Sequence, residues 1–281
     1  MSMAIGLRRG RAEYVHYLRD RREVVGSLIG TVGVFVALAR WQAGVPVEGT
    51  TASRAVLMAA GFIAFSVFSV ALMNLPMTIA ADREEGALLR LRAVPGGVRA
   101  YLVGRGVSLL AQIATYVVLM LAAGLAFAGL SLPTAVGDWF TLAWVLVLGT
   151  LAVVPLGAVL GVLLPGPRNA ASIVALPITG LMIVSGVMFP VTVMPAPVQW
   201  AAQAFPLYWQ GLGLRSVFLP DSMLAAEIGG SWRPVETAAV LGAWTVAGLA
   251  LAPWVLRRTA ARESGARTGA GRRERLAGAG R

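Results

Sequence analysis

The chain has 281 residues, of which 57% are hydrophobic and only 13% are charged. Charged residues are about half as frequent as in soluble domains, which excludes a disordered chain, a coiled coil and an ordinary soluble enzyme. Lysine and cysteine are absent, and the single histidine is His16. The chain therefore has no thiolate metal site, no cysteine nucleophile and no Walker A loop, which needs its lysine on the phosphates.

Six apolar blocks are long enough, or nearly so, to cross a membrane, which takes about 20 apolar residues per helix. We expect spans over residues 24–39, 55–81, 107–130, 139–164, 170–189 and 235–256. Twenty of the 24 arginines precede the first block, follow the sixth, or lie between blocks two and three or four and five. The positive-inside rule then predicts an all-α protein with six transmembrane helices and both termini in the cytoplasm. Arginine without lysine, with abundant alanine and glycine, favours a bacterial source and hence a bacterial cytoplasmic membrane.

The first block permits a second interpretation. Ala37-Leu38-Ala39 has the form of a signal-peptide cleavage site after an apolar stretch. The preceding segment is long, however, and carries Glu13, Asp20 and Glu23, which favours an uncleaved span.

Residues 1–23 are expected to form a cytoplasmic interfacial helix. Leu7, Tyr14 and Leu18 would share one face at helical spacing, as in an amphipathic helix that lies on the inner leaflet. A basic anchor that only fixes the topology is an equal alternative. At the other terminus, residues 257–281 are rich in arginine, glycine and alanine, which predicts a disordered basic cytoplasmic tail attracted to anionic lipid.

The connection over residues 82–105 carries charges of both signs. Asp82, Glu84 and Glu85 open it, where acidic residues favour the start of a helix, and several arginines follow. Three acids oppose simple lipid anchoring, so this connection predicts contact with a protein partner. A solvated turn is the alternative.

The longest connection, over residues 190–234, is rich in aromatic residues and prolines. It is too apolar for a free loop, and irregular backbone at membrane depth is tolerated only where protein or a cavity covers it. We expect an extracellular re-entrant helical hairpin between the fifth and sixth spans, followed by a short helix around residues 209–218. A folded cap without a gating role is the alternative.

The predicted spans hold no charged residue well inside them, which argues against a proton- or ion-coupled transporter. Weakly polar side chains remain, and two of them, Ser66 and Ser69, share one face of the second span with Phe62 and Met73 at i, i+4, i+7 and i+11 spacing. They would line an amphipathic substrate path, or else pack ordinarily between helices. The candidates for this path are Phe62, Ser66, Ser69, Met73, Thr179 and Ser185.

Two glycine pairs at i, i+4 spacing allow close approach of helices. They are Gly26 with Gly30 in the first span and Gly157 with Gly161 in the fourth. This motif is common in helical bundles and does not indicate a function.

Two motifs in this chain resemble those of ABC-2-type transporter permeases. The first is an acidic-Arg-Glu-x-Gly run, here Asp82-Arg83-Glu84-Glu85-Gly86-Ala87-Leu88, with Pro95 downstream. The second surrounds the fifth span, here Ser185-Gly186-Val187-Met188-Phe189-Pro190, then Phe205-Pro206-Leu207-Tyr208 and Arg215. Ala87 replaces a usual threonine, but the charged core of the first motif is intact. The size of the chain also resembles the daunorubicin-type, drug-resistance branch.

The resemblance implies that residues 1–256 form an ABC-2-type transmembrane domain with no ATPase site of its own. The residues implied to contact a partner ATPase and transmit its closure are Arg83, Glu84, Glu85 and Gly86. The residues implied to form an outer gate are Phe189, Pro190, Pro195, Phe205, Pro206 and Tyr208.

The same resemblance implies partners. They are two copies of a soluble ATP-binding cassette ATPase that binds ATP and magnesium, a second identical or paralogous permease protomer, membrane lipids and a hydrophobic drug-like substrate. No cofactor, metal or nucleic acid is expected on this chain. Export of a lipid or lipid-linked glycan is an alternative, and so is a non-transporting membrane scaffold or sensor, which would need no substrate path.

Overall fold

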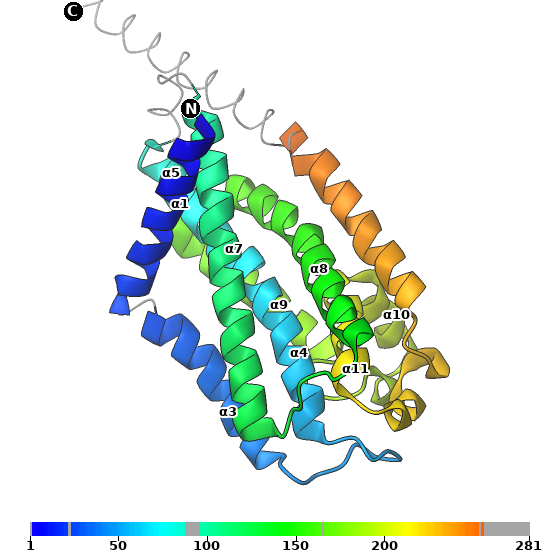
Figure 1. Ribbon diagram of the computed structural model, residues 1–281. Coiled ribbons are helices and arrows are strands. Elements are labelled where there is room, and N and C mark those ends of the chain that lie inside the picture. The colour runs from blue at the N-terminus through cyan, green and yellow to red at the C-terminus, as the bar shows by residue number, and fades with distance from the viewer. Residues whose placement is uncertain (1, 22–23, 88–95, 165, 253, 256–281) are drawn as a thin grey trace, which may run out of the picture.

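The described part of the chain is an all-helical bundle. The computed structural model (Figure 1) describes residues 2–21, 24–87, 96–164, 166–252 and 254–255. Within these ranges there is no β-strand, only one isolated bridge between Pro46 and Ser53. The predicted all-α membrane fold is therefore confirmed. The tail predicted over residues 257–281 lies outside the described residues, as do Leu88 and Pro95 of the first motif.

Five of the described helices are long and apolar enough to cross a membrane. They are Val24–Trp41, Arg54–Glu84, Ala100–Ala128, Val136–Leu163 and Pro234–Ala252. The span predicted over residues 170–189 corresponds to a shorter apolar helix, Ile173–Val184. The chain is thus a multi-pass membrane protein, and the count of six crossings stays a prediction.

One long helix forms the centre of the bundle and runs from one end to the other (Figure 1). It consists of α4 (Arg54–Ser69), the π-helical turn η2 (Val70–Asn74) and α5 (Leu75–Glu84). The π-helical turn lies just before Pro76, which has no N–H and cannot continue the α-helical bonding pattern. In η2 the Leu75 N–H instead reaches back to the carbonyl of Val70.

Other helices cover this central helix on most sides. They are α3 (Gly30–Trp41), α7 (Gly97–Ala123), η3 (Gly124–Ala128), α8 (Val136–Leu163) and α9 (Pro167–Val184). Before them in the chain come α1 (Ser2–Arg19), which packs on α7, and η1 (Val24–Ile29), which leads into α3. α4 contacts α3, α7 and α8, and almost all of its residues are buried. A helix that is apolar all round is stable in water-excluded surroundings, which explains why this sequence occupies the centre.

The connection predicted to be a re-entrant hairpin folds into short helices at the end of the bundle opposite the N-terminus (Figure 1). They are η4 (Val191–Val193), α10 (Ala196–Ala204), α11 (Pro206–Phe218), η5 (Asp221–Ala226) and η6 (Ile228–Gly230). Pro206 begins α11, where a missing N–H costs no hydrogen bond. α11 packs deeply against α4 and α8, so the helix expected around residues 209–218 is a buried part of the bundle.

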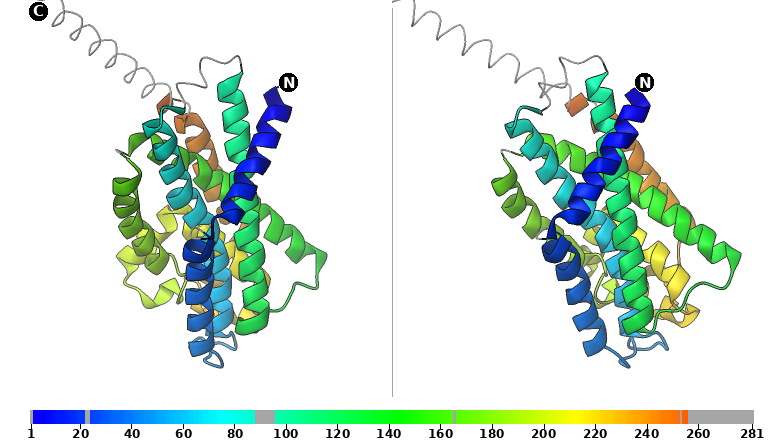
Figure 2. Two further views of the ribbon diagram at one scale, coloured as in Figure 1. Left: turned by 90° about the vertical axis from the view of Figure 1, so that its left-hand side faces the viewer. Right: turned by 60° about the vertical axis from the view of Figure 1, so that its left-hand side comes forward.

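The N-terminal helix α1 lies along the first half of α7, as both views in Figure 2 show. A Cβ on Gly6 would come within 2.8 Å of Val103, and one on Gly10 within 2.6 Å of the Gly104 carbonyl oxygen. The predicted face of α1 is divided, because Leu7 and Leu18 are exposed while the Tyr14 hydroxyl lies 2.5 Å from that of Thr115 on α7. Its glycines therefore decide how α1 packs on α7, and Leu7 and Leu18 stay exposed.

The fourth span packs on the central helix through two glycines. A Cβ on Gly157 would come within 1.9 Å of the Ala71 carbonyl oxygen, and one on Gly161 within 2.9 Å of the Pro76 Cα. Only glycine permits these distances, so this predicted close approach is confirmed. Gly26 and Gly30, the other predicted pair, have nothing within 4 Å in the described part of the chain.

We expect Gly157→Ala to destabilise the protein, because the new methyl group would meet helix backbone that cannot rotate away. Overpacking of this kind costs about 1–3 kcal/mol. The matched control is Gly180→Ala in α9, where a Cβ would meet nothing within 4 Å. Thermal unfolding of both variants in one detergent checks this expectation, and equal midpoints would contradict it.

Candidate functional site

The first motif ends the central helix and joins it to α8. Nη1 of Arg83 donates hydrogen bonds to the carbonyl oxygens of Gly161 at 3.5 Å and Leu164 at 3.4 Å, and also to that of Val162. The last carbonyls of a helix lack partners within the helix and carry its negative end charge. Arg83 therefore caps α8, and any movement of α5 here also moves the end of α8.

The two glutamates of the motif lie beyond Arg83 on the surface. Glu84 and Glu85 are both exposed, and Gly86 takes a φ of +68° that ends the helical run. The Glu84 carboxylate lies against the start of α9, since a Cβ on Gly166 would come within 2.4 Å of its Oε1. All four residues predicted to contact an ATPase are thus brought together at the N-terminal end of the bundle, beside the turn between α8 and α9.

A network of charged side chains around Asp82 joins α5 to α1 and α7. The Tyr101 hydroxyl donates to Oδ2 of Asp82 at 2.7 Å, and Arg105 forms an ion pair with the same oxygen. Arg105 also lies 3.4 Å from Glu13, which pairs with Arg9 at 2.8 Å. Both guanidinium groups stack over the Tyr101 ring, at 5.0 Å for Arg9 and 5.5 Å for Arg105. We call these five residues the Asp82 network.

Sequence reasoning found only part of this network. Asp82 and Arg105 lie in one predicted connection, but nothing in the pattern joined them to Glu13, which is about 70 residues earlier in the chain. The available signal was helical spacing, because Arg9 with Glu13 and Tyr101 with Arg105 are both i, i+4 pairs.

The residues proposed for a substrate path lie on one face of the central helix, but they are packed. The Ser66 side chain is fully buried and its hydroxyl donates to the Ile63 carbonyl at 2.7 Å. The Phe62 ring contacts that of Phe35 in α3 at 5.4 Å between centroids. Such satisfied, buried side chains are typical of helix packing, so a path along this face would need α4 to move relative to its neighbours.

The remaining path candidates differ in exposure. Ser69 and Met73 are partly buried and contact each other, with the serine hydroxyl 3.6 Å from the methionine sulfur. Thr179 is exposed on α9 and bonds its own helix at Ala175, whereas Ser185 is buried at the end of α9.

A buried ion pair lies at the opposite end of the bundle, beside Tyr208 of the proposed outer gate. Arg215 donates from Nε to Glu227 Oε1 at 2.5 Å and from Nη2 to Oε2 at 3.1 Å. Its Nη1 donates to the Gly186 carbonyl at 3.4 Å, and its guanidinium lies 5.9 Å from the centre of the Tyr208 ring. Arg215 therefore joins the end of α9, α11 and the η5–η6 segment. Glu227 was missed because no periodic pattern surrounds it.

The proposed gate residues divide into a buried and an accessible group. Pro206 and Tyr208 are buried in α11. Pro195 and Phe205 are exposed on either side of α10. Phe189 and Pro190 are partly buried and line an open pocket of 510 Å³ between the end of α3, the start of α4 and the η4 segment.

We expect Glu227→Gln to be strongly destabilising, since it leaves the Arg215 charge buried without its partner, which typically costs about 3–5 kcal/mol. The double change Arg215→Met with Glu227→Leu is expected to cost clearly less than the sum of the two single changes. Glu236→Gln is the control, because Glu236 is half exposed and exposed pairs contribute at most about 1 kcal/mol. Thermal unfolding midpoints in detergent measure all of these, and additive single effects would contradict the coupling.

Comparison with known proteins assigns the family. The model of the ABC-2 family transporter protein matches residues 45–253, which include both motifs and most of the chain. No curated protein matches the chain. The daunorubicin-type branch stays a prediction. The matched residues include the central helix, the first motif, which we call the Arg83 motif, and the buried segment after α9. The chain therefore belongs to the ABC-2 transporter family, as a permease component of an ABC transporter.

Proposed function

We propose that this chain is the permease of an exporter that moves a hydrophobic or amphipathic compound out across the cytoplasmic membrane. The energy would come from a separate ATP-binding cassette ATPase, a partner that membership of the family implies. The single observation that carries this proposal is the construction of the Arg83 motif. It presents two exposed carboxylates on a helix end that is tied to α1, α7, α8 and α9.

This construction suits the transmission of force. A partner that binds Glu84 and Glu85 would act on α5, and α5 cannot move without disturbing Arg83 on α8 or the Asp82 network on α1 and α7. The same helix continues through η2 and α4 to the pocket at the opposite end. A ligand or partner shifts a conformational equilibrium only by its difference in affinity for the two states. Closure of an ATP-bound ATPase dimer would supply that difference here.

The full transporter would contain two permease protomers and two ATPase subunits, with ATP and magnesium held by the ATPases. The second protomer would be identical or paralogous. This assembly distinguishes the proposal from a scaffold or sensor, which would need neither an ATPase nor a substrate.

The function is tested by purifying the tagged chain from its native host in mild detergent and identifying the bound proteins by mass spectrometry. We expect a soluble ATP-binding cassette ATPase in a ratio of one to one with the permease. If no such protein is recovered after cross-linking in several detergents, the exporter proposal fails and a scaffold or sensor is favoured.

We expect Glu84→Ala to reduce ATP-driven transport of an amphipathic dye in proteoliposomes by about tenfold or more, within the usual coupling energies of roughly 1–3 kcal/mol. Insertion and folding should be unaffected, because the Glu84 side chain is exposed. Glu236→Ala removes another exposed carboxylate, at the opposite end, and should transport normally. Unchanged transport in Glu84→Ala, with the ATPase bound, would show that Glu84 does not couple the two proteins.

A further inference from the structure

The pocket at the end of the bundle opposite the N-terminus has the size of a small-molecule site. Its volume is 510 Å³, and ligand pockets generally measure about 300–1,000 Å³. Three separate parts of the chain enclose it: residues 41–58, residues 188–193 and residues 225–226. By the positive-inside rule this end faces the outside of the cell.

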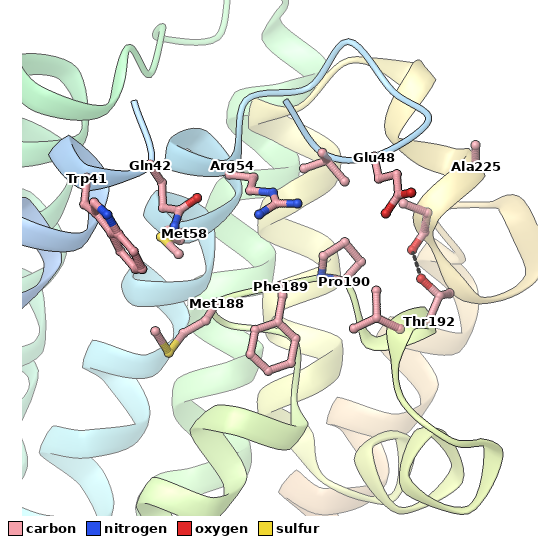
Figure 3. A pocket seen from close by; sticks show the side chains of 13 residues that line it. Trp41, Gln42, Glu48, Arg54, Met58, Met188, Phe189, Pro190, Thr192 and Ala225 are labelled. Carbon is pink, nitrogen blue, oxygen red and sulfur yellow. Dashed lines mark hydrogen bonds between the residues drawn. The ribbon is translucent and has the colours of Figure 1, made fainter. Parts of the chain in front are cut away.

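The walls of the pocket are mostly apolar. Trp41, Met58, Met188 and Phe189 line it, and Figure 3 shows Trp41 and the two methionines on the same side as Gln42, with Phe189 near the middle, beside Pro190. Methionine side chains adapt to irregular apolar shapes, and aromatic rings supply flat contact area. The pocket therefore fits acyl or ring carbons at this side.

Two opposite charges enter the same pocket. Arg54 extends from the first residue of α4 into the cavity, and Glu48 reaches toward it from the loop before α4 (Figure 3). No ion pair joins these two side chains, nor either of them to another residue in the described ranges. Elsewhere at this end, Arg215 and Arg233 both have carboxylate partners. Arg54 and Glu48 differ from them, because both line the pocket without forming an ion pair within the described part of the chain.

We propose that this pocket binds a zwitterionic amphiphile. Arg54 would hold its phosphate or carboxylate, for which a guanidinium provides two parallel donors. Glu48 would accept hydrogen bonds from its ammonium group, and the methionines and aromatic rings would cover the adjoining carbons. This goes beyond the proposed export, because occupation of the pocket needs no ATPase.

The test is equilibrium binding to the purified full chain in detergent, measured by native mass spectrometry. The probes are dihexanoyl-phosphatidylethanolamine, which carries both charges, and dihexanoyl-phosphatidylglycerol, which carries only the negative one. We expect the wild type to bind the ethanolamine lipid about tenfold more tightly. Arg54→Gln should weaken both lipids, and Glu48→Gln should remove only the preference for ethanolamine.

Controls keep the result specific to the pocket. Arg40→Gln removes an exposed arginine near the end of α3, close to the pocket but not lining it. Glu236→Gln removes an exposed carboxylate that does not line the pocket. Both should bind like the wild type. The proposal is overturned if the wild type shows no preference between the two lipids, or if Arg54→Gln binds as tightly as Arg40→Gln.

A zwitterionic amphiphile could come from the membrane or be cargo. Extraction of the wild type and Arg54→Gln from native membranes with a lipid-retaining polymer separates these sources. Phosphatidylethanolamine enriched only on the wild type identifies a membrane lipid, whereas a different zwitterionic compound enriched there identifies cargo. Equal recovery from both proteins contradicts the site. None of these outcomes depends on transport, so the export proposal stands or fails separately.

Discussion

The close packing of α8 on the central helix is the constraint on which the N-terminal end of the structure depends. Gly157 and Gly161 let the two backbones approach without intervening side chains. Only at this distance can Arg83 reach past α5 and cap the last carbonyls of α8. The short turn from α8 to α9 then lies beside Glu84, which gives the exposed carboxylates of the motif a fixed position.

The opposite end depends on a different kind of contact. Between α9 and the final helix the chain is a series of short helices, and these could not bury enough apolar surface to be stable alone. Arg215 holds them together from within, since it bonds Glu227 and the Gly186 carbonyl from the middle of the apolar region. One end is thus fixed by glycine packing and the other by a buried charge pair, with a single helix between them.

Much of this arrangement could be predicted from the sequence. Apolar blocks of sufficient length predicted the helices. The spacing of Gly157 and Gly161 predicted one close contact between helices, and the motif from Asp82 to Gly86 predicted where the exposed helix end lies. The contacts of Glu13 with Arg105 and of Glu227 with Arg215 could not be predicted, because each joins residues on separate elements and leaves no periodic trace. The sequence predicted that Ser66 and its neighbours in the proposed path share one helix face. It did not predict that this face is buried, because burial depends on packing against other helices. The span expected over residues 170–189 is shorter, since Ser185 and Gly186 end α9 early.

The π-helical turn before Pro76 is a point at which the central helix can bend. Pro76 donates no backbone hydrogen bond, and the Thr78 hydroxyl bonds the Asn74 carbonyl at 2.6 Å. The two halves of the helix can therefore change the angle between them here without losing a hydrogen bond from residue 76. A push on the Arg83 end would then tilt α5 relative to α4, and the direction of that tilt would be set by where this turn lies along the helix.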